Sequence, residues 1–143
     1  MISRMSRKKV IQVHNSLVFM LLFLPATSAF SRAQHMNEPD SPCAGPSSTA
    51  ELVGCLAKAF EASDGKLNSV YQTILKRLDG EDANRLVETQ RIWIKYRDAN
   101  CEAERALYEG GTAARPAYLG CMETMTRART KELQVTYTVR LKD

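Results

Sequence analysis

The stretch QRIWIKYRDANC, residues 90–101, decides the interpretation of the fold because it holds the chain's only tryptophan. Gln90, Trp93, Arg97 and Cys101 follow one another at steps of three or four residues, so their side chains share one face of a helix. Whatever Trp93 packs against, Gln90 and Arg97 must also meet. The stretch therefore predicts a binding surface, a catalytic cleft or a buried polar contact between helices.

Residues 1–29 have the composition of a secretory signal peptide. Four basic residues precede an apolar run at residues 17–24, and small residues follow the run. We expect cleavage after Ala29, or as late as Ala33. The run is shorter than the ~20 residues that span a bilayer, so a membrane anchor is the less favoured alternative. No cysteine stands in a lipobox position, since the first is Cys43.

Cleavage changes the charge of the chain. The full sequence has 20 Lys and Arg against 16 Asp and Glu, but four of the basic residues and none of the acidic residues lie in the signal peptide. The mature chain, about 110 to 114 residues, is then formally neutral and of a size typical of one small domain. This balance is no basis for nucleic-acid binding, and we expect none.

Four cysteines, Cys43, Cys55, Cys101 and Cys121, predict two disulfides in an exported chain. Three pairings are possible. The spacing contains no CxxC, and His14 and His35 fall in the signal peptide and the tail, so neither a metal site nor a cofactor is expected.

The mature chain begins with a proline-rich segment and continues with a helical pattern. Residues 30–48 contain three prolines and predict a flexible leader, tied down at Cys43. Ser48 and Glu51 have capping-box spacing, and apolar residues then recur with helical period to residue 78. We predict one helix over residues 49–79 with Gly65 inside it; two helices broken at residues 63–65 are the alternative.

Two further helices follow from the turn signals. A second helix runs from residue 81 or 82 to about 108. Gly110 and Gly111 then end it, and Pro116 suits the first turn of a third helix. Strand signals are weak and confined to residues 135–139. The helical domain spans residues 49–140, and the prediction is an all-α fold, a small three-helix antiparallel bundle stapled by two disulfides.

The predicted hairpin of the second and third helices suggests which cysteines pair. Cys101 lies about ten residues before the turn centre and Cys121 about ten after it, so antiparallel helices bring them level. We predict the pairs Cys101–Cys121 and Cys43–Cys55, with the crossed pairings as open alternatives.

The helical faces carry polar residues that a plain hydrophobic bundle would lack. If all three faces point inward, a polar seam forms from Asp64, Asn68, Gln90, Trp93, Arg97, Thr126 and Arg129. An unpaired buried charge costs several kcal/mol, so Asp64 should bridge Arg97 or Arg129. The seam either sets helix register, or it is a cleft that presents Arg97 and Arg129 to a carboxylate or phosphate.

Catalysis has little support in the sequence. No serine lies in a GxSxG context, no histidine lies in the predicted helices, and the cysteines are expected to be oxidised. Asp98, Glu102 and Glu104 fall on an outer helix face, where charges are usually solvated. We therefore expect that the protein is not an enzyme.

Three spaced motifs resemble the lysozyme inhibitor LprI-like N-terminal domain family of small exported bacterial proteins. The residues that carry the resemblance are Asp64, Leu67, Asn68 and Tyr71; Gln90, Trp93, Arg97 and Cys101; and Cys121, Thr126, Arg129 and Leu133. The likeness covers roughly residues 43–133. It implies an exported helical domain and, through the member that names the family, inhibition of lysozyme.

The predicted function is an exported protein-binding module, periplasmic or secreted, that inhibits lysozyme. We expect the contact at the loop formed by Glu109, Gly110, Gly111 and Thr112, because an inhibitor must place a loop in a sugar-binding cleft. One alternative is a small-ligand or envelope-stress binding domain that uses Arg97 and Arg129. Another is an adaptor or immunity-type partner of a second exported protein.

Overall fold

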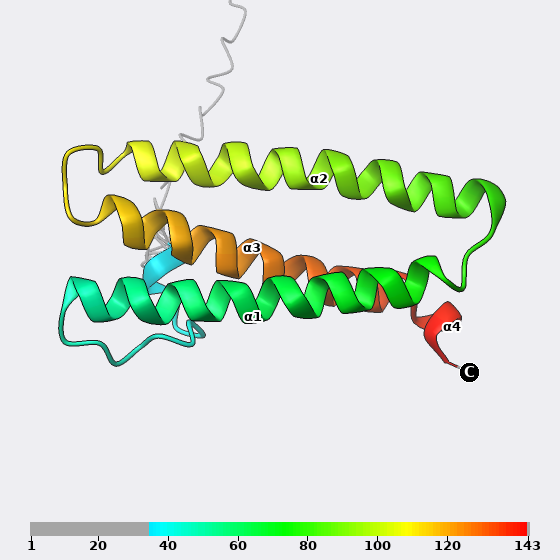
Figure 1. Ribbon diagram of the computed structural model, residues 1–143, viewed down its shortest axis with the longest axis horizontal. Coiled ribbons are helices and arrows are strands. Elements are labelled where there is room, and N and C mark those ends of the chain that lie inside the picture. Colours follow the sequence, from blue (N-terminus) through cyan, green and yellow to red (C-terminus); the bar gives the residue numbers. More distant parts are fainter. Residues whose placement is uncertain (1–34, 143) are drawn as a thin grey trace, which may run out of the picture.

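A computed structural model describes residues 35–142, so the predicted signal peptide and the first residues of the leader lie outside the described part. The elements are η1 (His35–Asn37), α1 (Thr49–Leu75), α2 (Gly80–Ala106), α3 (Ala114–Thr136) and α4 (Thr138–Leu141). The three long helices run antiparallel in succession (Figure 1). Residues 35–142 contain no strand, and the prediction of an all-α three-helix bundle is confirmed.

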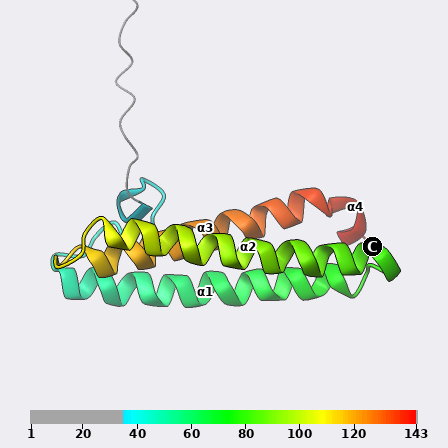
Figure 2. The same ribbon diagram turned by 90° about the horizontal axis from the view of Figure 1, so that it is seen from above.

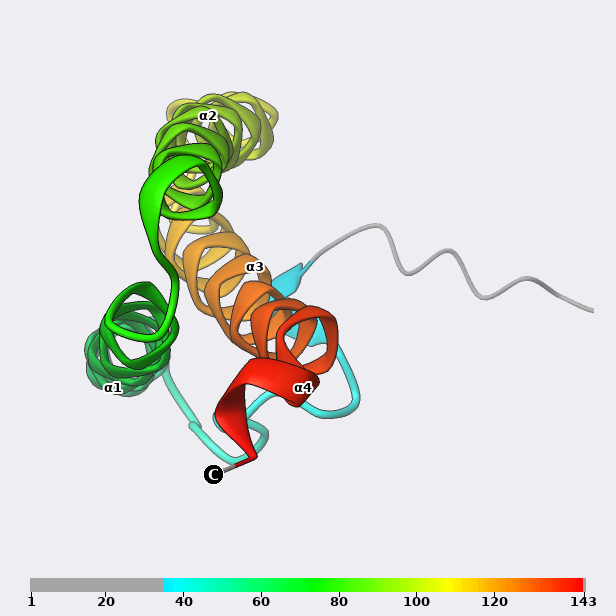
Figure 3. The ribbon, with the colours of Figure 1, turned by 90° about the vertical axis from the view of Figure 1, so that its right-hand side faces the viewer.

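The central helix of the bundle is α3. It packs along both α1 and α2, while the backbones of α1 and α2 stay apart (Figure 3). Ten residues of α3 are buried, against three in α1 and four in α2. The seam residues of α2 and α3 therefore lie where all three helices meet.

Helix α1 continues through Gly65 without a break, so the two-helix alternative is wrong. Its first turn is capped by Ser48, whose hydroxyl accepts from the Glu51 N–H at 3.3 Å. The Glu51 carboxylate accepts from the Ser47 N–H, one residue before the predicted partner Ser48, at 3.0 Å. That Ser47 N–H is the main reason why the pKa of Glu51 is lowered. The helix ends at Leu75, earlier than predicted, because residues 76–79 form a turn into α2.

The hydrophobic core lies along α3 in three clusters. At one end Leu67, Ile74, Leu86 and Leu133 are almost fully buried. Tyr137, between α3 and α4, and Leu141 of α4 pack against this cluster. Helix α4 follows the end of α3 at this end of the bundle (Figure 2). The weak strand signal at residues 135–139 is therefore wrong: these residues finish α3 and begin α4, and Tyr137 is the residue among them that packs against the core. The β propensity of a short segment does not decide its structure when its neighbours are helical.

Both predicted disulfides are present. Cys101 and Cys121 join α2 to α3 with an S–S distance of 2.04 Å, and both residues are fully buried. Cys43 and Cys55 join the leader to α1 with an S–S distance of 1.98 Å. The crossed pairings are thereby excluded, and the hairpin geometry that predicted Cys101–Cys121 is confirmed.

The described part of the leader, residues 35–48, makes contacts that the sequence did not predict. It lies against α3, and Met36 packs near Cys43, Leu56 and Leu119 (Figure 2). Asp40 pairs with Arg127 of α3 at 2.6 Å. These contacts add to the predicted tether at Cys43; the flexibility predicted for residues 30–48 stays a prediction.

Gly120 makes the close approach of the leader possible. A Cβ atom at this position would lie 2.7 Å from the backbone N and Cα of Met36. We expect Gly120→Ala to displace the leader and to lower the free energy of unfolding by about 1 to 3 kcal/mol, because backbone atoms cannot move aside as a flexible side chain can. Limited proteolysis of residues 35–42 and urea unfolding would measure both effects.

Gly65→Ala is the matched control. Gly65 is also helical, but nothing lies within 4 Å of its would-be Cβ. The same substitution there should stabilise the protein by about 0.5 to 1 kcal/mol, because alanine loses less backbone entropy in a helix than glycine does. Equal effects of the two changes would show that the Met36 contact is unimportant.

Candidate functional site

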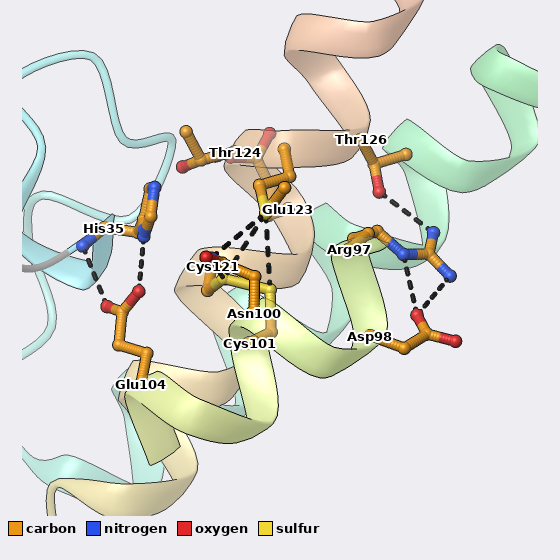
Figure 4. The surroundings of a disulfide bond; sticks show 11 residues. His35, Arg97, Asp98, Asn100, Cys101, Glu104, Cys121, Glu123, Thr124 and Thr126 are labelled. Atoms are coloured by element: carbon orange, nitrogen blue, oxygen red, sulfur yellow. Dashed lines mark hydrogen bonds and ion pairs between the residues drawn. A yellow bond between two sulfur atoms is a disulfide. The ribbon is translucent and has the colours of Figure 1, made fainter. Parts of the chain in front are cut away.

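Arg97 is the centre of the polar seam. It is only 8% exposed, and its guanidinium lies between two aromatic rings, 5.1 Å from the Trp93 centroid and 5.7 Å from the Phe60 centroid. Its Nη1 donates to Thr126 Oγ1 on α3 at 3.2 Å (Figure 4). Stacking and hydrogen bonding together hold the side chain in one place between the three helices.

Carboxylates balance the charge of Arg97. Asp98 Oδ1 accepts from Arg97 Nε at 3.0 Å and lies 2.9 Å from Nη2. Asp64 of α1 lies further away, at 3.6 Å from Nη1, and accepts a hydrogen bond from Asn68 at 3.0 Å. Asp98 is half exposed, as expected for an outer face, and it is nevertheless the closest carboxylate to Arg97.

Arg129 also lies against the ring of Trp93. Its guanidinium carbon is 5.7 Å from the Trp93 centroid, and its Nε donates to Gln90 Oε1 at 3.1 Å. Glu132 pairs with Nη1 at 2.8 Å. Arg97 and Arg129 thus contact Trp93, and the other seam residues join it through them: Gln90 by Arg129, Thr126 and Asp64 by Arg97, and the exposed Asn68 by Asp64. Each guanidinium already has a carboxylate within its own chain.

A groove among the described residues lies away from the predicted cleft of Arg97 and Arg129. It has a volume of about 280 Å³, lies between α1 and α3, and is lined by Ala62, Ser63, Lys66, Arg127, Thr130, Lys131 and Gln134. None of the seam residues lines it. The use of Arg97 and Arg129 as ligand-binding residues stays a prediction.

The loop between α2 and α3, residues 107–113, projects at the end of the bundle (Figure 1). Glu109, Gly110, Gly111 and Thr112 are exposed. Gly110 adopts φ 80°, a conformation that favours glycine, and the Gly111 N–H donates to the Tyr108 carbonyl at 2.9 Å. Short backbone bonds and the Cys101–Cys121 disulfide below the loop hold its shape.

A second polar cluster, absent from the sequence interpretation, surrounds Glu123 of α3. The Glu123 side chain is 3% exposed and accepts from Ser63 Oγ and from Arg127 Nε, each at 3.0 Å. Arg127 also pairs with Asp40 of the leader, and this bond is the main reason why the pKa of Arg127 is raised and that of Asp40 is lowered. Glu123, Thr126 and Thr130 are spaced by three and four residues, so they share one face of α3. This spacing is the sequence signal that could have placed Glu123 near the buried face.

His35 belongs to the fold and does not lie in a free tail. Its backbone N–H donates to Glu104 Oε1 at 3.1 Å, and its ring nitrogen Nδ1 meets the other carboxylate oxygen (Figure 4). Glu104 was expected to be solvated on an outer face, but its side chain is 10% exposed because the leader covers it.

His35, Glu104 and Cys121 could be mistaken for a metal site. Their ligand atoms lie within 4.8 Å of one another. The Cys121 sulfur is bonded to Cys101 and offers no thiolate, so this group has two ordinary ligands. Two ligands are fewer than a structural or catalytic zinc site uses, and the group does not fit a zinc ion.

Comparison with known proteins identifies the family. Residues 42–133 match the family model described as Lysozyme inhibitor LprI. The chain is 28% identical over 110 residues to the uncharacterized protein R02472 of Rhizobium meliloti, an alignment that covers 68% of this chain and 79% of that protein. It is 29% identical over 99 residues to the uncharacterized protein YecT of Escherichia coli, an alignment that covers 59% of this chain and 61% of YecT.

No solved structure shows a significant match. The matched region contains α1, α2, most of α3 and both disulfides, and the chain belongs to the lysozyme inhibitor LprI family.

Proposed function

We propose that this protein is an exported, non-catalytic binding module that inhibits lysozyme through the α2–α3 loop. The family assignment supports protein binding in general, and the predicted signal peptide supports export to the periplasm or beyond. Within residues 35–142 no helix is long and apolar enough to cross a membrane.

The observation that carries the proposal is the loop of residues 107–113. It stands at one end of the molecule, offers the exposed carboxylate of Glu109 and begins with Leu107, which is 77% exposed. An apolar anchor beside an acceptor group suits a sugar-binding cleft. Because the loop is already held by backbone bonds and a disulfide, little conformational entropy would be lost on binding.

The test is lysozyme turnover of cell walls in the presence of the mature protein. We expect micromolar protein to slow turnover. Glu109→Ala should weaken this inhibition by about tenfold, because the variant loses one charge-assisted hydrogen bond to lysozyme. Inhibition should depend only weakly on salt, because the mature chain is formally neutral.

Glu81→Ala is the control for Glu109→Ala. Glu81 is an exposed acid in the first turn of α2, at the far end of the molecule from the loop (Figure 1). Its removal makes the same change in net charge and should leave inhibition unchanged. The proposal fails if the mature protein does not slow lysozyme at low or moderate salt, or if the two variants behave alike.

The small-ligand alternative predicts a different result. It requires Arg97→Leu to abolish ligand binding while the fold stays intact, but Arg97 is stacked, hydrogen-bonded and paired within the bundle. We therefore propose that Arg97 and Arg129 set the packing of the three helices, and that recognition takes place at the loop.

A further inference from the structure

An apolar stripe on α2 has no partner among residues 35–142. Ile92 is 58% exposed and Tyr96 is 60% exposed. Ala99, Ala103 and Ala106 follow them, also exposed, at alternating steps of three and four residues. This is the spacing of a coiled-coil seam. The buried residues of α2 lie on another face, and α2 forms one edge of the bundle (Figure 1).

We propose that this stripe, named here the α2 stripe, pairs with the same stripe of a second copy in an antiparallel, two-fold symmetric homodimer. Its large residues stand at one end and its small residues at the other. An antiparallel pair can set Ile92 against Ala103 of the partner subunit, and Tyr96 against Ala99 of the partner subunit. Each large side chain then meets a small one, as close packing requires.

A parallel pair would fit poorly. It would set Ile92 against the same residue of the partner, and likewise Tyr96, while the alanines opposite one another would leave space. The order of residue sizes along the α2 stripe therefore selects the antiparallel arrangement.

Charges beside the α2 stripe point to the same arrangement. Lys95 and Glu102 flank it on one side, seven residues apart. In the antiparallel pair each Lys95 lies beside Glu102 of the partner subunit, so two attractive contacts form per dimer. In a parallel pair the flanking neighbours would be Asn100 and Leu107, which are uncharged.

Both charges are available for this contact. Lys95 has no ion-pair partner within residues 35–142. Glu102 accepts from Arg105 at 2.6 Å, and this hydrogen bond lowers the pKa of the Glu102 carboxyl. A carboxylate has room for a second cationic partner.

The dimer should be weak. The α2 stripe spans about four helical turns, less surface than the ~1,200 to 2,000 Å² of stable complexes, so a Kd in the micromolar range is expected. Antiparallel pairing would place the two Glu109 loops at opposite ends of the pair, each near the first half of α2 of the partner subunit. Self-association goes beyond the proposed function and is measured without lysozyme.

Sedimentation equilibrium of the mature protein, from about 5 to 500 μM, tests the proposal. Lys95→Glu and Glu102→Lys should each weaken the dimer by about tenfold, because each creates two repulsive contacts. The double variant should restore the wild-type Kd to within about threefold. Lys58→Glu, an exposed lysine of α1, makes the same charge change and should have no effect.

Zero-length carbodiimide crosslinking gives an independent measurement. The covalent dimer should contain a peptide in which Lys95 is joined to Glu102 of the partner subunit. Ile92 and Tyr96 are exposed in one copy, so Ile92→Asp should abolish the dimer while the circular dichroism spectrum of the fold is kept. A chain that stays monomeric up to about 500 μM, or a dimer that both single charge variants leave intact, overturns the proposal.

Discussion

Replacing Arg127 with leucine is expected to lower the free energy of unfolding by about 3 to 5 kcal/mol. The reason is Glu123, whose side chain is 3% exposed and whose Oε1 accepts from Arg127 Nε at 3.0 Å. Without the guanidinium this carboxylate keeps only the hydroxyl partners Ser63 and Thr124. A buried carboxylate without a cation is among the most costly arrangements in a protein interior. Urea unfolding at neutral pH would measure the loss.

Two further variants separate the buried charge from other effects of Arg127→Leu. In Glu123→Leu/Arg127→Leu no charge remains in the site, so much of the lost stability should return. Asp40→Asn removes a partner of Arg127 whose side chain is 63% exposed, and should cost less than about 1 kcal/mol. If the double variant is as unstable as the sum of the single variants, the pairing of Glu123 with Arg127 does not explain the loss.

Removal of the Cys101–Cys121 disulfide is expected to cost about 3 kcal/mol. The bond closes a loop of sequence separation 20, and in the chain-entropy model a loop of this size restricts the unfolded chain by about that amount. Both sulfurs are buried between α2 and α3, so Cys101→Ala/Cys121→Ala also loses close packing. Thermal and urea unfolding of the double variant under oxidising conditions would show the change.

The second disulfide provides the comparison. Cys43–Cys55 closes a loop of sequence separation 12, for which the same model predicts nearly the same entropy. It ties the leader to α1, however, and does not join two long helices. We expect Cys43→Ser/Cys55→Ser to speed proteolysis of residues 35–48 while the helical transition changes less. Equal shifts of the helical transition in both variants would mean that leader and helices unfold as one unit.

The helices and disulfides were predictable because their signals are local or nearly so. The apolar period from Leu52 to Leu78 carried α1 through Gly65, and Gly110 with Pro116 marked the α2–α3 turn. Once that turn is located, helix geometry alone brings Cys101 level with Cys121. The seam around Trp93 could also be anticipated, since its members repeat along three helical faces.

The contacts of Glu104 and Asp40 could not be predicted in the same way. Each depends on a partner more than 60 residues away in the chain, His35 for Glu104 and Arg127 for Asp40. The proline-rich leader has no period from which its path could be inferred. The position of the leader depends on tertiary contacts such as the close approach of Met36 to Gly120.

By itself the sequence determined the helical class and the hairpin order, because these follow from helical periodicity and from short turns. It favoured the observed cysteine pairs, and the structure then excluded the crossed pairings. Only the tertiary structure decided that Asp98 is the closest partner of Arg97, that Glu123 is buried beside Arg127, and that the α2 stripe is left exposed. The physical reason is that the path of a long side chain, the burial of a charge and the exposure of a helix face depend on which helices become neighbours. In this protein α3 is packed against both other helices, and α2 keeps a free face.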